Sequence, residues 1–167
     1  MILQFLKNYL ENNSTPLPCP YSPLLSGANP TKIYLDNIST NYAKNEVISL
    51  HQPTTPRVHA TFWNGTTNPP EVVTTTIILY VRSKMPSDGT LAVPISDGDY
   101  AGVRQTALAL RDAINRISMA PYSDGNGSYV VNQVRPISEA SFDHKDGQGR
   151  NIYLVRFEAN WAWTSLV

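Results

Sequence analysis

The chain has one cysteine, Cys19, among its 167 residues. A lone cysteine cannot form an internal disulfide, and no second thiol is present to begin a zinc site. The sequence is therefore not that of a disulfide-stapled secreted scaffold, and it favours assembly in the cytoplasm of the cell that makes it.

Charge is scarce as well. Thirteen Lys and Arg residues balance thirteen Asp and Glu residues, and charged residues make up 16% of the chain, against roughly a quarter in ordinary soluble domains. A net charge of zero gives no support to a whole-molecule attraction to nucleic acid or to an anionic membrane. A weakly charged surface protects poorly against self-association, which fits a subunit of an assembly.

Long apolar runs and signal sequences are also missing. No run approaches the roughly 20 apolar residues that a membrane-spanning helix needs. The opening stretch MILQFLKNYLENN is interrupted by Gln4 and Lys7, and it lacks the basic region and cleavage site of a secretory signal. We expect no membrane association.

Catalytic and cofactor motifs are absent. The sequence contains neither a Gly-x-Ser-x-Gly elbow nor a phosphate-binding loop. The histidines His51, His59 and His144 are scattered, whereas a metal site needs three or four converging ligands. Asp143, Asp146 and Gly147 resemble the start of a calcium loop, but no later Glu closes it. The sequence thus predicts no enzyme, no metal and no cofactor, and a solvated hairpin tip at residues 143–150.

What the sequence does contain is a strong helix pattern at residues 100–117. One apolar stripe recurs at spacings of three and four residues, and its members are Val103, Ala107, Leu110, Ile114 and Ile117. The polar side chains that fall elsewhere on the helix are Arg104, Arg111, Asp112, Asn115 and Arg116. Asp97 and Asp99 are candidates for the N-cap, Asp112 and Arg116 can pair one turn apart, and Pro121 is expected to end the helix together with the glycines after it.

A second, shorter helix is predicted at the N-terminus and is followed by a proline-rich stretch. Its apolar side is formed by Ile2, Leu3, Phe5, Leu6, Tyr9 and Leu10. This side packs either on the domain's own core or on a neighbouring subunit. Residues 14–30 contain five prolines, which remove backbone donors and forbid a regular helix. We expect a semi-rigid, extended connector there.

Strand patterns account for much of the remaining chain. Candidate strands span residues 32–38, 46–52, 57–63, 72–82, 128–138 and 151–163. The stretch at 72–82 is rich in β-branched residues and is expected to be central or covered on both faces. In the last strand the odd-numbered side chains are almost all apolar and should pack on the helices, whereas the even-numbered face carries Arg156 and Glu158 at its middle.

These elements predict one α+β domain over residues 1–167. The expected architecture is a mixed, mainly antiparallel sheet with the N-terminal helix and the long helix packed on one face.

Four stretches together resemble the tail terminator proteins of long-tailed phages, which are also called tail-completion or minor capsid proteins. They are the opening MILQFLKNYLEN helix, the VVTTTIILYVRSK strand, the YAGVRQTALALRDAI helix and the terminal NIYLVRFEANWAW strand. The resemblance is one of element order and strand character, and it covers residues 1–13 and about 72–163. No motif ties residues 14–63 to the family.

The resemblance implies a virion structural protein that forms a ring, usually a hexamer. Such a ring caps the tail tube, contacts the tube protein and the head–tail connector, and lets the genome DNA pass through its channel without sequence-specific binding. A ring needs an interface between two different surfaces, and we expect Arg104, Arg111, Arg156 and Glu158 to lie in it. Two alternatives are a head–tail connector subunit of the neck and a monomeric domain that binds a protein partner through its proline-rich stretch.

Overall fold

The computed structural model describes residues 2–11, 32–36, 47–59, 72–82, 97–124, 127–147 and 149–166. These residues form the helices α1 (Ile2–Glu11) and α3 (Asp97–Asn115). The strands are β1 (Lys32–Leu35), β2 (Val47–His51), β3 (Arg57–His59), β4 (Val72–Arg82), β5 (Ser118–Asp124), β6 (Gly127–Pro136), β7 (Ser141–Lys145) and β8 (Asn151–Leu166). Cys19, the proline-rich connector at 14–30 and the end of the strand predicted at 57–63 lie outside the described residues.

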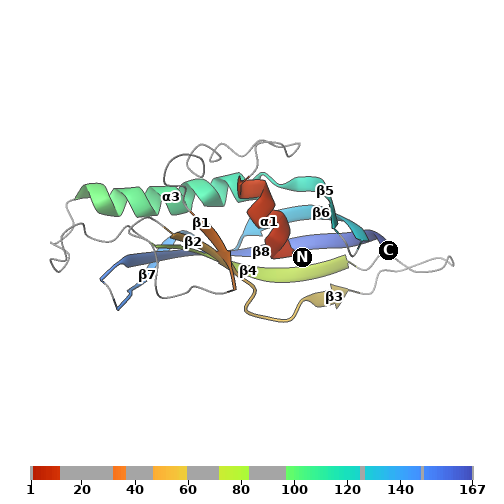
Figure 1. Ribbon diagram of the computed structural model, residues 1–167, viewed down its shortest axis with the longest axis horizontal. Coiled ribbons are helices and arrows are strands. Elements are labelled where there is room, and N and C mark those ends of the chain that lie inside the picture. Colours follow the sequence, from red (N-terminus) through yellow and green to blue (C-terminus); the bar gives the residue numbers. More distant parts are fainter. Residues whose placement is uncertain are drawn as a thin grey trace.

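The strands form one curled sheet with the order β1-β2-β4-β8-β6-β5, in which β3 also pairs with β4 and β7 with β8. Only β1 and β2 run parallel among the described pairs. β4 and β8 are paired along the whole of β4, from Val72 opposite Ala162 to Arg82 opposite Ile152. Both helices cover the same face of this sheet (Figure 1). The predicted α+β architecture is confirmed.

Strand β4 is central, as its composition predicts. Its β-branched and aromatic residues suit a pleated strand between two neighbours. The odd-numbered side chains, from Val73 to Val81, are buried, while the even-numbered ones are half-buried. The odd-numbered side chains therefore face the helices and the even-numbered ones face the other side of the sheet.

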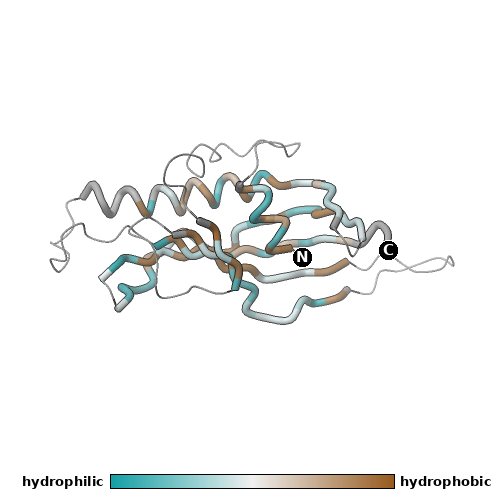
Figure 2. Tube along the Cα trace, viewed as in Figure 1, coloured by the Kyte–Doolittle hydropathy of each residue, from teal (hydrophilic) through white to brown (hydrophobic). Residues whose placement is uncertain are grey.

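The core lies between the helices and the odd-numbered side chains of the central strands. All five members of the predicted stripe on α3 are buried, as are Tyr153, Val155, Phe157, Ala159 and Trp161 on β8. Along α1 and the coloured part of α3, hydrophobic residues recur among hydrophilic ones (Figure 2), as in an amphipathic helix. Neither described helix has the length and hydropathy to span a bilayer.

Helix α1 packs on the core of its own chain, which was one of the two alternatives. All six apolar residues of its predicted stripe are buried. The hydroxyl of Tyr9 donates a hydrogen bond to the backbone oxygen of Ala113 in α3, at 3.2 Å. The ring of Phe5 meets that of Tyr122 in β5 edge to face, with 5.6 Å between centroids. The helix therefore ties α3 to the edge of the sheet.

The predicted role of Pro121 in ending the long helix is wrong. Helix α3 begins at Asp97 and ends at Asn115, and the N–H groups of Arg116 and Ile117 close its last turn on carbonyls three residues back. Pro121 lies beyond the helix, inside β5, opposite Val130 of β6. Because β5 is the last strand in the sheet order, one side of Pro121 needs no N–H donor, so proline is tolerated there.

The predicted hairpin tip at 143–150 is also wrong in part. Residues 143–145 belong to β7, which pairs with the first residues of β8. Every side chain of β7 is exposed, so the sequence shows no alternation of polar and apolar residues there. The turn comes after β7. In it the N–H of Gly149 donates to the backbone oxygen of Asp146, and the N–H of Asp146 donates to the backbone oxygen of Arg150.

Candidate functional site

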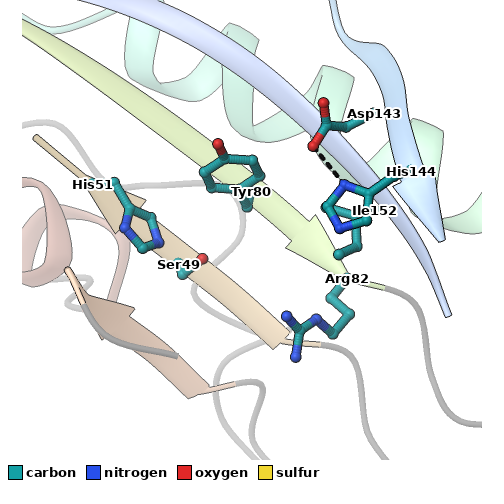
Figure 3. A pocket seen from close by; sticks show the side chains of 7 residues that line it. All are labelled: Ser49, His51, Tyr80, Arg82, Asp143, His144 and Ile152. Carbon is teal, nitrogen blue, oxygen red and sulfur yellow. Dashed lines mark hydrogen bonds and ion pairs between the residues drawn. The ribbon is translucent and has the colours of Figure 1, made fainter. Parts of the chain in front are cut away.

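A pocket opens on the face of the sheet that the helices leave uncovered (Figure 3). Its volume is about 310 Å³. Its lining side chains come from β2, β4, β7 and β8, and they are Ser49, His51, Tyr80, Arg82, Asp143, His144 and Ile152.

Strand register brings these residues together. Ser49 lies opposite Tyr80 across β2 and β4, Arg82 lies opposite Ile152 across β4 and β8, and His144 lies opposite Ile152 across β7 and β8. The register of β7 shifts between Phe142 and His144. A bulge at this point re-aims side chains, so Asp143 and His144 can both border the pocket although they are adjacent in sequence.

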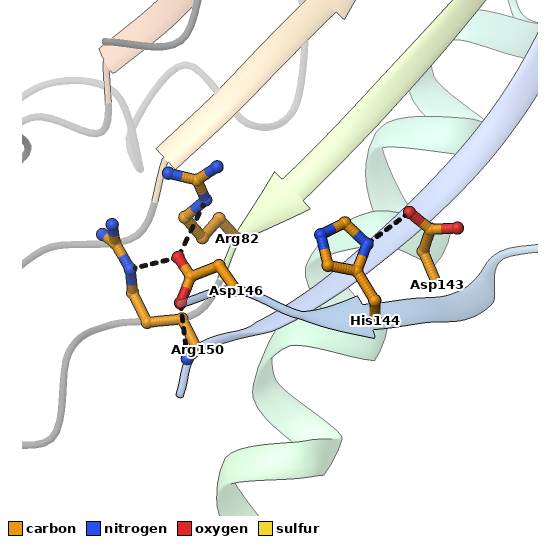
Figure 4. A network of polar contacts seen from close by, with 5 residues as sticks. All are labelled: Arg82, Asp143, His144, Asp146 and Arg150. Carbon is orange, nitrogen blue, oxygen red and sulfur yellow. Dashed lines mark hydrogen bonds and ion pairs between the residues drawn. The ribbon is translucent and has the colours of Figure 1, made fainter. Parts of the chain in front are cut away.

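A buried charge network lies beside the pocket, at the turn between β7 and β8 (Figure 4). The carboxylate of Asp146 accepts hydrogen bonds from the backbone N–H and the Nε of Arg150, each at 2.9 Å. The side chain of Arg150 is only 1% exposed. Asp146 is therefore the counter-ion of a buried guanidinium.

Arg82 contacts the same carboxylate at a longer distance. Its Nε lies 3.5 Å from Oδ2 of Asp146, and its side chain is 13% exposed. This Nε is buried and has no hydrogen-bond partner. Burial, and then the positive charge of Arg150, lower the pKa of Arg82, while Asp146 opposes the shift.

His51 brings a second unsatisfied polar atom to the pocket. Its Nε2 is buried and has no hydrogen-bond partner. The imidazole meets the ring of Tyr80 edge to face, with 5.2 Å between centroids. Burial lowers the pKa of His51, and the carboxylate of Asp36 opposes the shift. The imidazole is therefore neutral at pH 7 and has one N–H to donate.

His144 is held by Asp143, whose Oδ2 lies 2.7 Å from Nδ1 of the imidazole. No hydroxyl or thiol is hydrogen-bonded to His144 in the described ranges, so the pair is not part of a nucleophile–base arrangement there. No group of three His, Cys, Asp or Glu side chains suited to a metal ion occurs among the residues that the structure describes.

The residues predicted for a subunit interface fall on two faces of the molecule. Arg104 is exposed on α3. Arg111, also on α3, is bound to the carboxylates of Asp112 and Glu139, and its side chain is 21% exposed. Asp112 pairs with its neighbour Arg111 and not, as predicted, with Arg116.

Arg156 and Glu158 lie on β8, on the even-numbered face that the helices leave uncovered. Glu158 is bound to Arg135, the residue opposite it on β6, at 2.6 Å. The side chain of Arg156 is exposed, and only its backbone makes hydrogen bonds, to Ser138 and Ile137. The structure thus separates the two predicted pairs onto opposite faces of the sheet.

The pocket was not predicted from the sequence. Period-two alternation places Tyr80 and Arg82 on one face of β4, and this is the single signal that the sequence offers. The cross-strand register that adds Ser49, His51, Asp143 and His144 is not encoded in any local pattern.

No family model matches the chain, and no curated protein matches it.

Proposed function

We propose that the protein is a ring-forming tail terminator of a long-tailed phage, which caps the tail tube and joins it to the head–tail connector. The proposal starts from the likeness in element order and strand character described above. Its partners would be further copies of itself, the tube protein and the connector protein, with the genome DNA passing through the channel.

The observation that carries the proposal is the presence of two different polar surfaces on opposite faces of one sheet. One surface is the outer side of α3 around Arg104 and Arg111, and the other is the open face of β8 around Arg156 and Glu158. A closed ring uses a heterologous interface, in which one surface of each subunit meets a different surface of the next. Two such surfaces on opposite sides of a subunit suit this arrangement.

The charges on the two surfaces suggest how they would meet. Arg104 and Arg156 are both exposed, and arginine is enriched at protein interfaces because its planar guanidinium donates several hydrogen bonds. Exposed carboxylates on the α3 side can accept these hydrogen bonds. One is Glu139, which contacts Arg111 and whose side chain is 83% exposed. Arg156 of one subunit would bind this acidic edge of the α3 surface on the next.

Native mass spectrometry of the purified protein at micromolar concentration tests the proposal. We expect a discrete closed oligomer, with six subunits as the leading stoichiometry. A strict monomer that is also absent from purified virions would contradict it. A ring found at the head side of the neck in virion images would instead assign the chain to the connector.

Deletion of residues 14–30 separates the ring from a monomeric binding domain. A ring subunit is expected to lose or weaken its self-association. A binding domain would stay monomeric before and after the deletion and would lose a protein partner instead.

A further inference from the structure

The segment from β6 into β7, residues 137–142, carries two exposed apolar side chains. Ile137 directly follows β6 and is 52% exposed, and Phe142 lies in β7 and is 45% exposed. Among the described residues, the other exposed large hydrophobic side chains are those of Val58 and Met119. A single exposed apolar side chain needs no explanation, but two of them gather in this short segment.

Ile137 lies on the open face of the sheet, beside Arg156. Pro136 is opposite Phe157, whose side chain is buried on the helix-covered face, and the next position along a strand points to the other side. The N–H of Ile137 donates a hydrogen bond to the backbone oxygen of Arg156, at 2.8 Å. The side chain of Arg156 is exposed, and only its backbone makes hydrogen bonds within the described part of the chain. Ile137 and Arg156, the open-face pair, thus join an apolar side chain to a cation that is open to a partner.

Phe142 lies on the opposite, helix-covered face. It is opposite Tyr153, and the two rings meet edge to face with 5.9 Å between centroids. Tyr153 belongs to the core beneath the helices, so Phe142 continues this face toward solvent. Three residues earlier, Glu139 contacts Arg111 of α3 with a side chain that is 83% exposed. Phe142 and Glu139, the helix-face pair, thus join an apolar ring to an exposed carboxylate.

We propose that segment 137–142 is the centre of a contact between two copies of the chain, in which the open-face pair of one copy packs on the helix-face pair of the next. Charge complementarity selects a second copy as the occupant, because the guanidinium of Arg156 is open on one face and the carboxylate of Glu139 is exposed on the other. Ile137 and Phe142 supply the apolar centre that protein interfaces enclose in a polar rim.

The contact is head to tail, because its two sides are different surfaces. It rests on the proposed function, in which it joins neighbouring subunits of the ring. The two ideas can nevertheless fail separately, since a head-to-tail contact does not require a phage tail and a ring does not require this contact.

Cysteine cross-linking tests the contact in the full chain, with Cys19→Ser in every sample so that only introduced thiols remain. Chains carrying Ile137→Cys are mixed with chains carrying Phe142→Cys and oxidised, since a disulfide needs Cα atoms within about 7 Å. We expect disulfide-linked dimers in the mixture and none in either variant alone, because a head-to-tail contact never sets a residue against its own copy. Val58→Cys, at an exposed apolar position of β3, is the matched control and should not cross-link with either variant.

Sedimentation velocity measures what the apolar centre contributes. Ile137→Ser and Phe142→Ser should each raise the dissociation constant of self-association by about ten-fold or more, as expected of residues at the centre of an interface. Met119→Ser, which removes an exposed apolar side chain from β5, should leave the constant unchanged. Circular dichroism confirms that each variant is folded.

The outcomes separate the contact from the proposed function. If the wild type forms an oligomer that persists in both serine variants, and the mixed cysteine variants do not cross-link, the contact is overturned and the ring stands. Cross-links in a single-variant sample would show a symmetric contact and overturn the head-to-tail arrangement. A strict monomer without cross-links overturns both ideas. Cross-links in the mixture alone, from a protein that is absent from purified virions, support the contact and overturn the tail function.

Discussion

At the scale of single residues, the half-buried carboxylate of Asp146 has a structural role that the sequence does not reveal. Asp146 looks like a solvated turn residue, yet it neutralises Arg150, whose side chain is 1% exposed, and it faces Arg82 as well. Removing one partner of a buried ion pair is far more damaging than removing an exposed pair, because the remaining charge stays buried.

Asp146→Ala is therefore expected to lower the free energy of unfolding by about 3 kcal/mol. The measurement is urea denaturation followed by circular dichroism, with the slope of the transition compared between variants. Asp112→Ala is the matched control, since Asp112 also pairs with an arginine but its side chain is 58% exposed, and it should cost about 1 kcal/mol or less. Equal losses for the two variants would refute the structural role of Asp146.

His51 predicts a specific loss of stability in acid. Burial holds its pKa in the folded protein below the ordinary value of 6.5, with Asp36 opposing the shift and Tyr80 packed against the ring. The unfolded chain therefore takes up this proton first as the pH falls. Stability from this group is complete above about pH 6.5, decreases as the pH drops toward the lowered pKa, and is constant below it.

The free energy of unfolding measured from pH 8 to pH 5 checks this sign. His51→Gln cannot take up a proton, so the wild type should lose more stability than the variant between pH 6.5 and pH 5. Parallel curves for the two proteins, or a wild type that gains relative stability in acid, would contradict the assigned direction.

At the scale of elements, the sequence predicts both described helices and the strands with a clear apolar or alternating pattern, short ones included. The bounds of β4 agree with the predicted 72–82, and the five-residue stripe on α3 is buried as expected. The missed elements, β5 and β7, are edge strands, in which one side has no partner among the described strands. Edge strands can carry Pro121 or a wholly exposed set of side chains, and both features hide them from a search for alternating residues.

The candidate site could not be predicted for a related reason. Alternation along one strand assigns Tyr80 and Arg82 to a face, but the pocket needs the register of β2, β4, β8 and β7 together. That register joins strands that are distant in the sequence and includes a bulge in β7, and a local pattern specifies neither.

A substitution at Leu110 tests whether the apolar stripe holds α3 on the core. It is 1% exposed at the middle of the α3 stripe, so Leu110→Asp buries a charge among apolar side chains of the sheet. We expect loss of the folded state at 25 °C, seen as loss of near-ultraviolet circular dichroism. Arg104→Asp, an acidic substitution on the exposed side of the same helix, should remain folded. A folded Leu110→Asp would mean that α3 is not held by this stripe.

At the scale of the whole molecule, the two polar surfaces predict how charge-reversal variants assemble, first each alone and then mixed. In a heterologous ring each subunit uses both its α3 surface and its β8 surface. Arg104→Glu should disable the first surface and Arg156→Glu the second, so each variant alone should be monomeric. Both residues are exposed, so neither substitution should lower the free energy of unfolding by more than about 0.5 kcal/mol.

A mixture of the two variants should behave differently from either one. The Arg104→Glu chain keeps an intact β8 surface and the Arg156→Glu chain keeps an intact α3 surface, so one interface of the native kind can still form between them. We expect heterodimers that cannot grow or close, detected as a single new mass by native mass spectrometry. Lys145→Glu, a charge reversal at an exposed position of β7, should assemble like the wild type. If the mixture stays monomeric, or if either variant alone still forms the wild-type oligomer, then the α3 and β8 surfaces are not the two sides of one interface.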